Sequence, residues 1–142
     1  MTPAAIDQLT AQLKTDEGFR QFPYQDTVGI LTVAYGRNLK HVGISRDEGE
    51  VLLRNDIDKA LSGCARMIPG FPGFDDARQA VLVNMTFNMG IGGVLAFKKM
   101  LEAVRAGDYF SAATEMLDSQ WARQVGARAD RLARIMQTGV ME

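Results

Sequence analysis

The stretch DEGFRQFPYQDTVGILTVAYGRNL, residues 16–39, holds the polar residues and turn signals that decide the fold. It carries a carboxylate at Glu17, a second at Asp26 and a hydroxyl at Thr32, separated by eight and five residues. Glycines and one proline divide the stretch into turns, because these residues interrupt helices and strands. We therefore expect a helix that ends near Glu17, then a tight hairpin with Asp26 near one end and Thr32 on the returning strand.

Three polar side chains on different elements would then face one space. Two carboxylates beside a cleft suit cleavage of a glycosidic bond, since one protonates the leaving oxygen and the other serves the cationic sugar or a water. Each residue also has a simpler interpretation. Glu17 could be a solvated carboxylate at a helix end, Asp26 a turn former and Thr32 an ordinary strand residue.

Several motifs together resemble those of the bacteriophage lysozymes, the T-even-type muramidases and their shorter relatives. They are E-x8-D-x5-T, Y-x-D-T-x-G and T-x-x-Y-G-R-N. The run NMTFNMG at 84–90, Trp121 and the tail at 131–139 extend the resemblance over nearly the whole chain. Any one motif would be weak, but the ordered set is specific.

The resemblance implies an inverting muramidase that hydrolyses the β-1,4 bond between N-acetylmuramic acid and N-acetylglucosamine in peptidoglycan. Glu17 would be the proton donor, and Asp26 with Thr32 would hold or activate water on the opposite face of the sugar. Other residues match family positions near the cleft, although packing or hydrogen bonding along a helix face is an open alternative for each. These supporting or substrate-binding residues are Tyr24, Asn84, Phe87, Asn88 and Arg128.

The resemblance also implies two ion pairs, between Arg128 and Glu17 and between Arg131 and Asp16. Without it, Arg128 would be read as one more exposed basic residue.

Two departures from the best-known T-even member stand out. Arg37 replaces a histidine, so an ion pair made there would titrate differently. Ala34 replaces a glycine, which leaves less backbone freedom. The longer family members carry an insertion after this region that the present chain lacks, so we expect a reduced small lobe.

The periodicity predicts helices together with one short sheet, and the resemblance implies an α+β, lysozyme-like fold in a single domain of residues 1–142. Thr2 and Pro3 are typical of a helix start, and Gly18 of a helix end. Ser45 and Glu48 form a capping box before the longest helix. Periodicity and capping predict a short antiparallel sheet from Phe22 to Tyr35 and a long helix at about 46–68. The resemblance implies that this helix bridges a small lobe at about 15–45 and a helical lobe at about 69–142 that includes the N-terminal helix.

Within the helical lobe, we expect one helix from Asp75 or Asp76 to about Met89 and another over 94–106. A further helix after Asp108 should point Phe110, Ala113 and Leu117 inward. The last helix should surround residues 128–136.

Composition excludes several classes of function. With 16 basic and 17 acidic side chains, the chain lacks the bulk positive charge of a nucleic-acid-binding protein. Cys64 is the only cysteine and His41 the only histidine, so we expect no internal disulfide and no metal site. The GIGG run at 90–93 does not follow a strand, so it is not a dinucleotide fingerprint, and no cofactor is expected.

We expect no cleavable signal peptide and no stable membrane insertion, because polar residues interrupt the apolar stripe of the first helix. The resemblance implies a monomer that stays in the host cytoplasm until release and then acts on the periplasmic cell wall. It also implies that the partners are peptidoglycan glycan strands and that function depends on a holin, the small phage membrane protein that opens a route for such enzymes.

Two other classes remain open. A lytic transglycosylase or a chitinase on a related fold would also use an acid like Glu17, but a transglycosylase needs no residue that holds water. A catalytically inactive wall-binding relative would need neither carboxylate.

Overall fold

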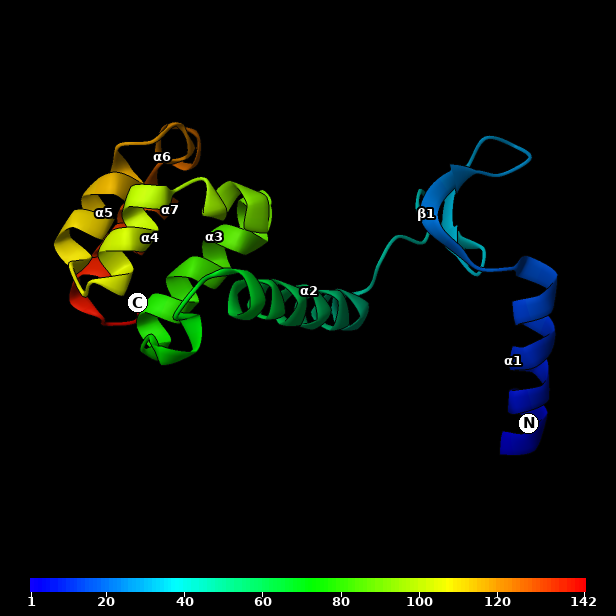
Figure 1. Ribbon diagram of the computed structural model, residues 1–142. Helices are drawn as coiled ribbons and strands as arrows, with labels where there is room; N and C mark the ends of the chain where they lie inside the picture. The colour runs from blue at the N-terminus through cyan, green and yellow to red at the C-terminus, as the bar shows by residue number, and fades with distance from the viewer. The chain divides into compact units, whose positions relative to one another are not determined.

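The computed structural model describes residues 1–142 and contains two compact units, Met1–Val51 and Leu52–Glu142. The first unit contains helix α1 (Pro3–Glu17) and a small sheet, and the second is helical (Figure 1). Helix α2 (Arg46–Met67) begins in the first unit and continues in the second. A short antiparallel sheet combined with a helical unit confirms the predicted α+β class. The assignment of the N-terminal helix to the helical lobe stays a prediction.

Helix α1 begins and ends where the sequence indicates. The Thr2 hydroxyl accepts a hydrogen bond from the backbone N–H of Ala5 at 3.2 Å, and Pro3 occupies the first helical position. Gly18 has a φ of 67° and donates its N–H to the carbonyl of Lys14 at 3.1 Å, which closes the helix. Glu17 is therefore the last residue of α1.

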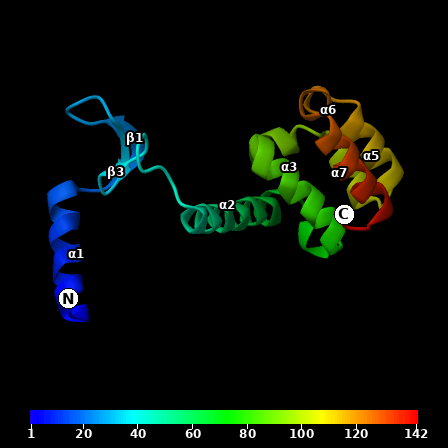
Figure 2. The same ribbon diagram turned by 180° about the vertical axis from the view of Figure 1, so that it is seen from behind.

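The sheet has three antiparallel strands in chain order: β1 (Arg20–Gln25), β2 (Leu31–Ala34) and β3 (Arg37–Asn38). Residues Tyr24 and Thr32 are direct partners across β1 and β2, and an irregularity lies between Arg20 and Tyr24. The sheet starts two residues earlier than predicted, and β3 was not expected. Both β1 and β3 are labelled in the view from behind (Figure 2).

Two residues with left-handed backbone angles, one at the end of β2 and one in the following turn, reverse the chain toward β3. Ala34 has a φ of 56° and is the only residue other than glycine with a positive φ, and Gly36 has a φ of 74°. Glycine adopts this conformation freely, whereas the Cβ of alanine approaches a backbone carbonyl oxygen there. The sequence departure at Ala34 therefore places a strained residue at the end of β2, directly before this turn.

The predicted capping box at the start of α2 is confirmed. The Ser45 hydroxyl accepts from the N–H of Glu48 at 3.2 Å, and the Glu48 carboxylate accepts from the N–H of Ser45 at 2.8 Å.

Five helices and one 3-10 turn complete the second unit. They are η1 (Phe71–Gly73), α3 (Asp76–Leu95), α4 (Lys98–Arg105), α5 (Tyr109–Leu117), α6 (Gln120–Val125) and α7 (Ala127–Thr138). Their core is rich in methionine and small residues, with Met85, Met100, Met116 and Met136 fully buried. Long unbranched thioether side chains fill irregular gaps between short helices well.

Two helix boundaries differ from the prediction. Gly90 has a φ of 81° and a ψ of 160°, so it kinks α3 at the position where the sequence predicted an end, but the helix resumes as far as Leu95. Because α3 extends to Leu95, the helix that was predicted over 94–106 is shorter in the structure, where α4 spans Lys98–Arg105. Helix α6 was not predicted; it is a short helix capped by the Ser119 hydroxyl, which accepts from the N–H of Ala122.

The inward face of α5 also differs from the prediction. Phe110 is 68% exposed and Leu117 is 45% exposed, so the prediction that they point inward is wrong, whereas Ala113 is buried. The buried residues of α5 are Ala112, Ala113 and Met116, so small alanines rather than large side chains face the core. Phe110 and Leu117 instead line a hollow of about 330 Å³ with residues of α7.

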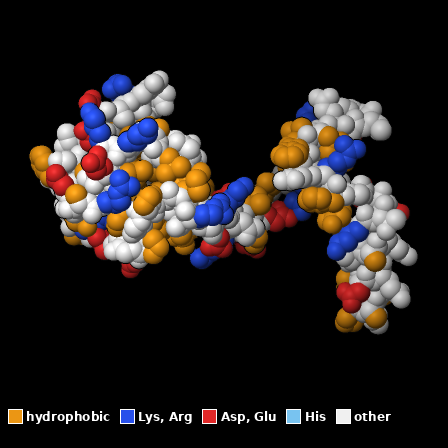
Figure 3. Space-filling model, viewed as in Figure 1, with side chains coloured by type: hydrophobic (Ala, Val, Ile, Leu, Met, Phe, Trp, Pro, Cys, Tyr) orange, Lys and Arg blue, Asp and Glu red, His pale blue; other side chains and the backbone are white.

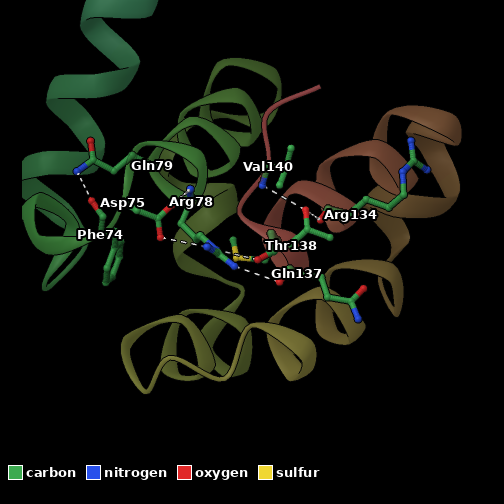
Figure 4. A network of polar contacts seen from close by, with 9 residues as sticks. Phe74, Asp75, Arg78, Gln79, Arg134, Gln137, Thr138 and Val140 are labelled. Atoms are coloured by element: carbon green, nitrogen blue, oxygen red, sulfur yellow. Dashed lines mark hydrogen bonds and ion pairs between the residues drawn. The ribbon is translucent and has the colours of Figure 1, made fainter.

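The Arg78 side chain joins the start of α3 to the end of α7 (Figure 4). Its Nε donates to the carbonyl of Met136 at 2.9 Å and its Nη2 to the carbonyl of Gln137 at 3.1 Å. Its Nη1 pairs with Asp75 at 3.2 Å, and its Cζ lies 3.7 Å from the centre of the Tyr109 ring. One guanidinium thus satisfies two carbonyls at the end of a helix that lack intrahelical partners.

Apolar side chains are visible on the surface of the first unit around its sheet (Figure 3). The exposed ones there include Phe19, Phe22, Val28, Leu31 and Tyr35. No single helix of the chain has both the length and the apolar composition for a membrane span; only α3 and α4 taken together, across a sharp bend, meet that test.

Replacement of Ala34 by glycine should stabilise the protein, because glycine relieves the strain of a positive φ. We expect the free energy of unfolding to rise by roughly 0.5–1 kcal/mol, measured by urea denaturation. The matched control is Ala11→Gly in the exposed middle of α1, which should lower it by about 1 kcal/mol. The same sign of change at both positions would contradict this account of Ala34.

Candidate active site

The Glu17 side chain lies against the turn between β2 and β3. A Cβ placed on Gly36 would be 2.7 Å from Oε2 of Glu17 and 3.1 Å from its Cδ. The carboxyl group therefore occupies the space next to the Gly36 backbone where any other residue would carry a side chain. Glu17 itself is exposed at the end of α1.

The Asp26 carboxylate organises the turn that joins β1 and β2. Its Oδ1 accepts hydrogen bonds from the N–H groups of Val28 at 2.9 Å and Ile30 at 2.8 Å. Its own N–H donates to the carbonyl of Ile30 at 2.9 Å. Asp26 thus acts as a turn former, as its simpler interpretation proposes. Both side-chain bonds fall on Oδ1, which leaves Oδ2 for another partner.

Thr32 is 5% exposed, and its hydroxyl donates to the carbonyl of Ile30 at 2.9 Å. Ile30 is therefore a backbone bridge between the two polar side chains. Its N–H binds the Asp26 carboxylate, and its carbonyl accepts both the Asp26 N–H and the Thr32 hydroxyl. The structure brings Asp26 and Thr32 together in one hairpin, as the sequence predicts.

Tyr24 belongs to the same hairpin. It is the direct partner of Thr32 across β1 and β2, and its side chain is half-buried. The Arg20 guanidinium lies over the Tyr24 ring, with its Cζ 4.6 Å from the ring centre. This cation–π contact restrains the ring beside the strand that carries Thr32.

The chemical capacity of this hairpin follows from the unused atoms. Asp26 Oδ2 accepts hydrogen bonds, and the Thr32 oxygen retains acceptor capacity after its proton is donated. A water that donates to both oxygens would be held with a lone pair free for attack. Glu17 lies against Gly36, in the turn that follows β2.

A bidentate ion pair fastens β3 to the start of α2. Both terminal nitrogens of Arg37 bind the Glu48 carboxylate, Nη1 at 2.7 Å, and Nη1 also donates to the carbonyl of Gly43 at 3.1 Å. Hydrogen bonds from Arg37 and from the N–H of Ser45 lower the pKa of Glu48 to about 2. Arg37, which stands where the best-known T-even member has histidine, is thus an ion-pair partner of Glu48, the glutamate of the capping box.

In the helical unit, Asn84 on α3 holds Arg128 on α7. The Asn84 Oδ1 accepts from Nε of Arg128 at 3.0 Å and from Nη2 at 2.7 Å, and its backbone carbonyl accepts from Nη2 at 3.3 Å. These bonds fix the guanidinium on the helical unit. The roles in binding that the resemblance assigns to both residues stay predictions.

The next turn of α3 carries Asn88 and Phe87. The Asn88 Oδ1 accepts the indole N–H of Trp121 at 2.8 Å, so this amide anchors α6. Phe87 is 44% exposed and lines a hollow of about 380 Å³ with residues of α2 and α3, among them Lys59 and Gly63. Both residues lie immediately before the kink at Gly90. No group of three or more His, Cys, Asp or Glu side chains is placed to hold a metal ion.

Two features of the site were not singled out in the sequence. The contact of Gly36 with Glu17 joins residues 19 apart, so no local pattern shows it. The pairing of Arg37 with Glu48 could have been anticipated, since the sequence places opposite charges on the two sides of one short loop.

The phage lysozyme family model matches residues 14–136. The chain is 30% identical, over 94% of its length, to the pre-baseplate central spike protein Gp5 of Enterobacteria phage T4, of which it spans 28%. It is 24% identical to probable T4-type lysozyme 1 of Dictyostelium discoideum, with 96% and 97% of the two chains covered. It is 28% identical, over 70% of its length, to a SAR-endolysin of Bacteriophage PS119, of which it covers 60%.

These similarities, with the α+β fold, define a lysozyme-like protein. The chain belongs to the phage lysozyme family. Membership supports a cell-wall hydrolase of the glycoside hydrolase class. The alignments with the spike protein and the Dictyostelium lysozyme run over 162 and 165 positions, which exceed the 142 residues of this chain. Those relatives therefore contain residues that this chain lacks.

The contribution of the Arg37–Glu48 pair to the stability of the first unit should not change with pH near neutrality. Because the Glu48 pKa is lowered to about 2, its contribution is fully present above its unfolded pKa and is lost as pH falls toward 2. In Arg37→His, the pair would instead be lost as pH rises through the folded pKa of the histidine.

We therefore expect the melting temperature of Arg37→His to fall further below wild type at about pH 8 than at about pH 5. Arg46→His, at an exposed position in the same unit, should show no such difference. If the melting temperature of Arg37→His lies equally far below wild type at both pH values, the proposed role of this pair is contradicted.

Proposed function

We propose that this protein is an endolysin-type muramidase that hydrolyses the β-1,4 bond between N-acetylmuramic acid and N-acetylglucosamine. The observation that carries the proposal is the hairpin in which Ile30 links Asp26 to Thr32. The position of Glu17 against Gly36, in the turn that follows β2, adds to it. Membership of the phage lysozyme family supplies the class of reaction.

In the proposed mechanism, Glu17 protonates the glycosidic oxygen as the bond to the sugar breaks. Its place at the end of α1, outside the hydrogen-bonded sheet, leaves the carboxyl group accessible to a substrate. A negative charge at a helix C-terminus is disfavoured by the helix dipole. A glutamate at this end of α1 is therefore slightly unfavourable unless it has a partner or a task, which supports the proposed role.

Asp26 and Thr32 would hold the attacking water. Two backbone N–H groups bind Oδ1 of Asp26, so the carboxylate is oriented before substrate arrives and Oδ2 accepts a proton from the water. The Thr32 oxygen accepts the second hydrogen of that water. Water that attacks the face opposite the leaving group inverts the anomeric centre.

Five further residues would bind or support the glycan strand. Tyr24 and Phe87 present aromatic surface, Asn84 and Asn88 present amides, and Arg128 presents a cation oriented by Asn84. Amides and aromatic rings suit the hydroxyl groups and apolar faces of amino sugars.

The proposed setting is lysis of a host cell by a monomer that depends on a holin for access to the wall. The cell-wall substrate and the similarity to an endolysin support this setting. The similarity to a spike protein favours a second one, in which a chain of this kind acts as part of a larger protein. Both settings use the same hydrolysis.

The substitution Glu17→Gln should abolish lysis while the fold persists, because the amide cannot donate the required proton. We expect a loss of about 10²–10⁴-fold in the rate of turbidity decrease of outer-membrane-permeabilised Gram-negative cells. Glu50→Gln, an equally exposed change on α2, is the matched control and should retain activity. A Glu17→Gln protein that clears cells near the wild-type rate would refute the assignment.

Hydrolysis should invert the anomeric centre. Proton NMR immediately after cleavage of glycan strands should show α-anomeric reducing ends produced from a β bond. Fresh β product would mean that Asp26 or another carboxylate is a nucleophile and would contradict the proposed mechanism, and anhydro ends would indicate a lytic transglycosylase.

The variant Asp26→Asn separates catalysis from turn formation. Its side-chain oxygen can still accept from Val28 and Ile30, so the hairpin should fold, but the amide cannot take a proton from water. We expect the melting temperature of Asp26→Asn to equal that of wild type, while release of reducing ends from peptidoglycan is lost. Undiminished activity of Asp26→Asn would exclude a water-activating role and support a transglycosylase.

A further inference from the structure

We infer that Gly36 is a positioning residue for the proposed catalytic acid, because its missing side chain leaves the space that the Glu17 carboxyl group occupies. This inference rests on the proposed function. A Cβ on Gly36 would lie 2.7 Å from Oε2 of Glu17, closer than such atoms approach in folded proteins. Any other residue at this position would have to displace the carboxylate or move the turn.

The contact is specific to Gly36 among the positive-φ glycines of the first unit. Gly18 and Gly29 have open space where a Cβ would lie, and Gly43 has only the carbonyl of Leu39 at 3.9 Å. These glycines are explained by their backbone angles alone. Gly36 combines a φ of 74° with a close contact to a functional side chain, so backbone conformation does not account for it fully.

A second contact keeps the end of α1 against the same turn. The rings of Phe19 and Tyr35 pack with centroids 5.4 Å apart, and the Lys14 ammonium lies 5.9 Å from the centre of the Tyr35 ring. These residues flank Glu17 and Gly36 in the sequence. The backbone of both segments is thus held together independently of the carboxyl group.

The consequence of an added methyl group follows from this arrangement. Oε2 lies at the free end of a flexible, exposed side chain, whereas the helix end and the turn are restrained by the aromatic pair. The lowest-energy response is rotation of the Glu17 carboxyl group away from its position. Misplacement of a reacting group by about 1 Å can cost about 10²-fold in rate. The substitution should therefore reduce activity far more than it reduces stability.

The test compares Gly36→Ala with Gly43→Ala, which shares the penalty of alanine at a positive φ but lacks the contact with Glu17. Both should melt below wild type by similar amounts, since the backbone strain is similar. Release of reducing ends from purified peptidoglycan should fall about 10²-fold in Gly36→Ala and stay close to wild type in Gly43→Ala.

A second measurement does not depend on activity. The Glu17 carboxyl carbon, observed by NMR in protein with ¹³C-labelled glutamate, should change its chemical shift in Gly36→Ala and keep it in Gly43→Ala, because only the first substitution moves the carboxyl group. Identical chemical shifts, equal activities of the two variants, or a Gly36→Ala protein that does not fold would overturn the inference. Wild-type protein that releases no reducing ends, with the NMR difference present, would overturn the proposed function and leave the positioning role standing.

Discussion

The left-handed backbone at Ala34 and Gly36 is the constraint on which the first unit depends. It reverses the chain within two residues, so that β3 pairs with β2 directly after the turn. The reversal places Gly36 next to the Glu17 carboxyl group and Arg37 within ion-pair distance of Glu48. A wider turn would separate these contacts, and the end of α1 would lose its support on the sheet. Strain at Ala34 is tolerated because contacts on both sides of the turn determine its conformation.

The helical unit depends on a comparable closure at a helix end. Gly139 ends α7 with a φ of 73°, and the Arg78 guanidinium fills the space next to it, where a Cβ would meet its nitrogens. The Arg78 guanidinium donates hydrogen bonds to the carbonyls of Met136 and Gln137. The ring of Tyr109 packs against the same guanidinium. In both units a glycine without a side chain makes room for a charged group. The Arg78 arrangement stabilises the fold, and we propose that the Glu17 arrangement serves the reaction.

Local sequence signals predicted the elements whose causes are local. The cap at Thr2, the capping box of Ser45 and the full extent of α2 follow from residues within four positions of one another. The errors arise where tertiary contacts decide. Phe110 follows helical periodicity yet is exposed, because alanines of α5 occupy the core-facing positions instead. Likewise, the spacing of the candidate site residues was visible in the sequence, but the contact between Glu17 and Gly36 was not, since only the folded turn brings them together.

The two interpretations of Asp26, turn former and catalytic residue, are compatible once its oxygens are considered separately. Oδ1 accepts both backbone N–H groups and fixes the hairpin, which any turn-forming aspartate would do. The same bonds remove the rotational freedom of the carboxylate, so Oδ2 points in one direction without further cost. Thr32 repeats the pattern, because its proton is donated to Ile30 while its oxygen remains able to accept. We propose that the structural role of one atom prepares the neighbouring atom for chemistry, and the same backbone residue, Ile30, binds both side chains.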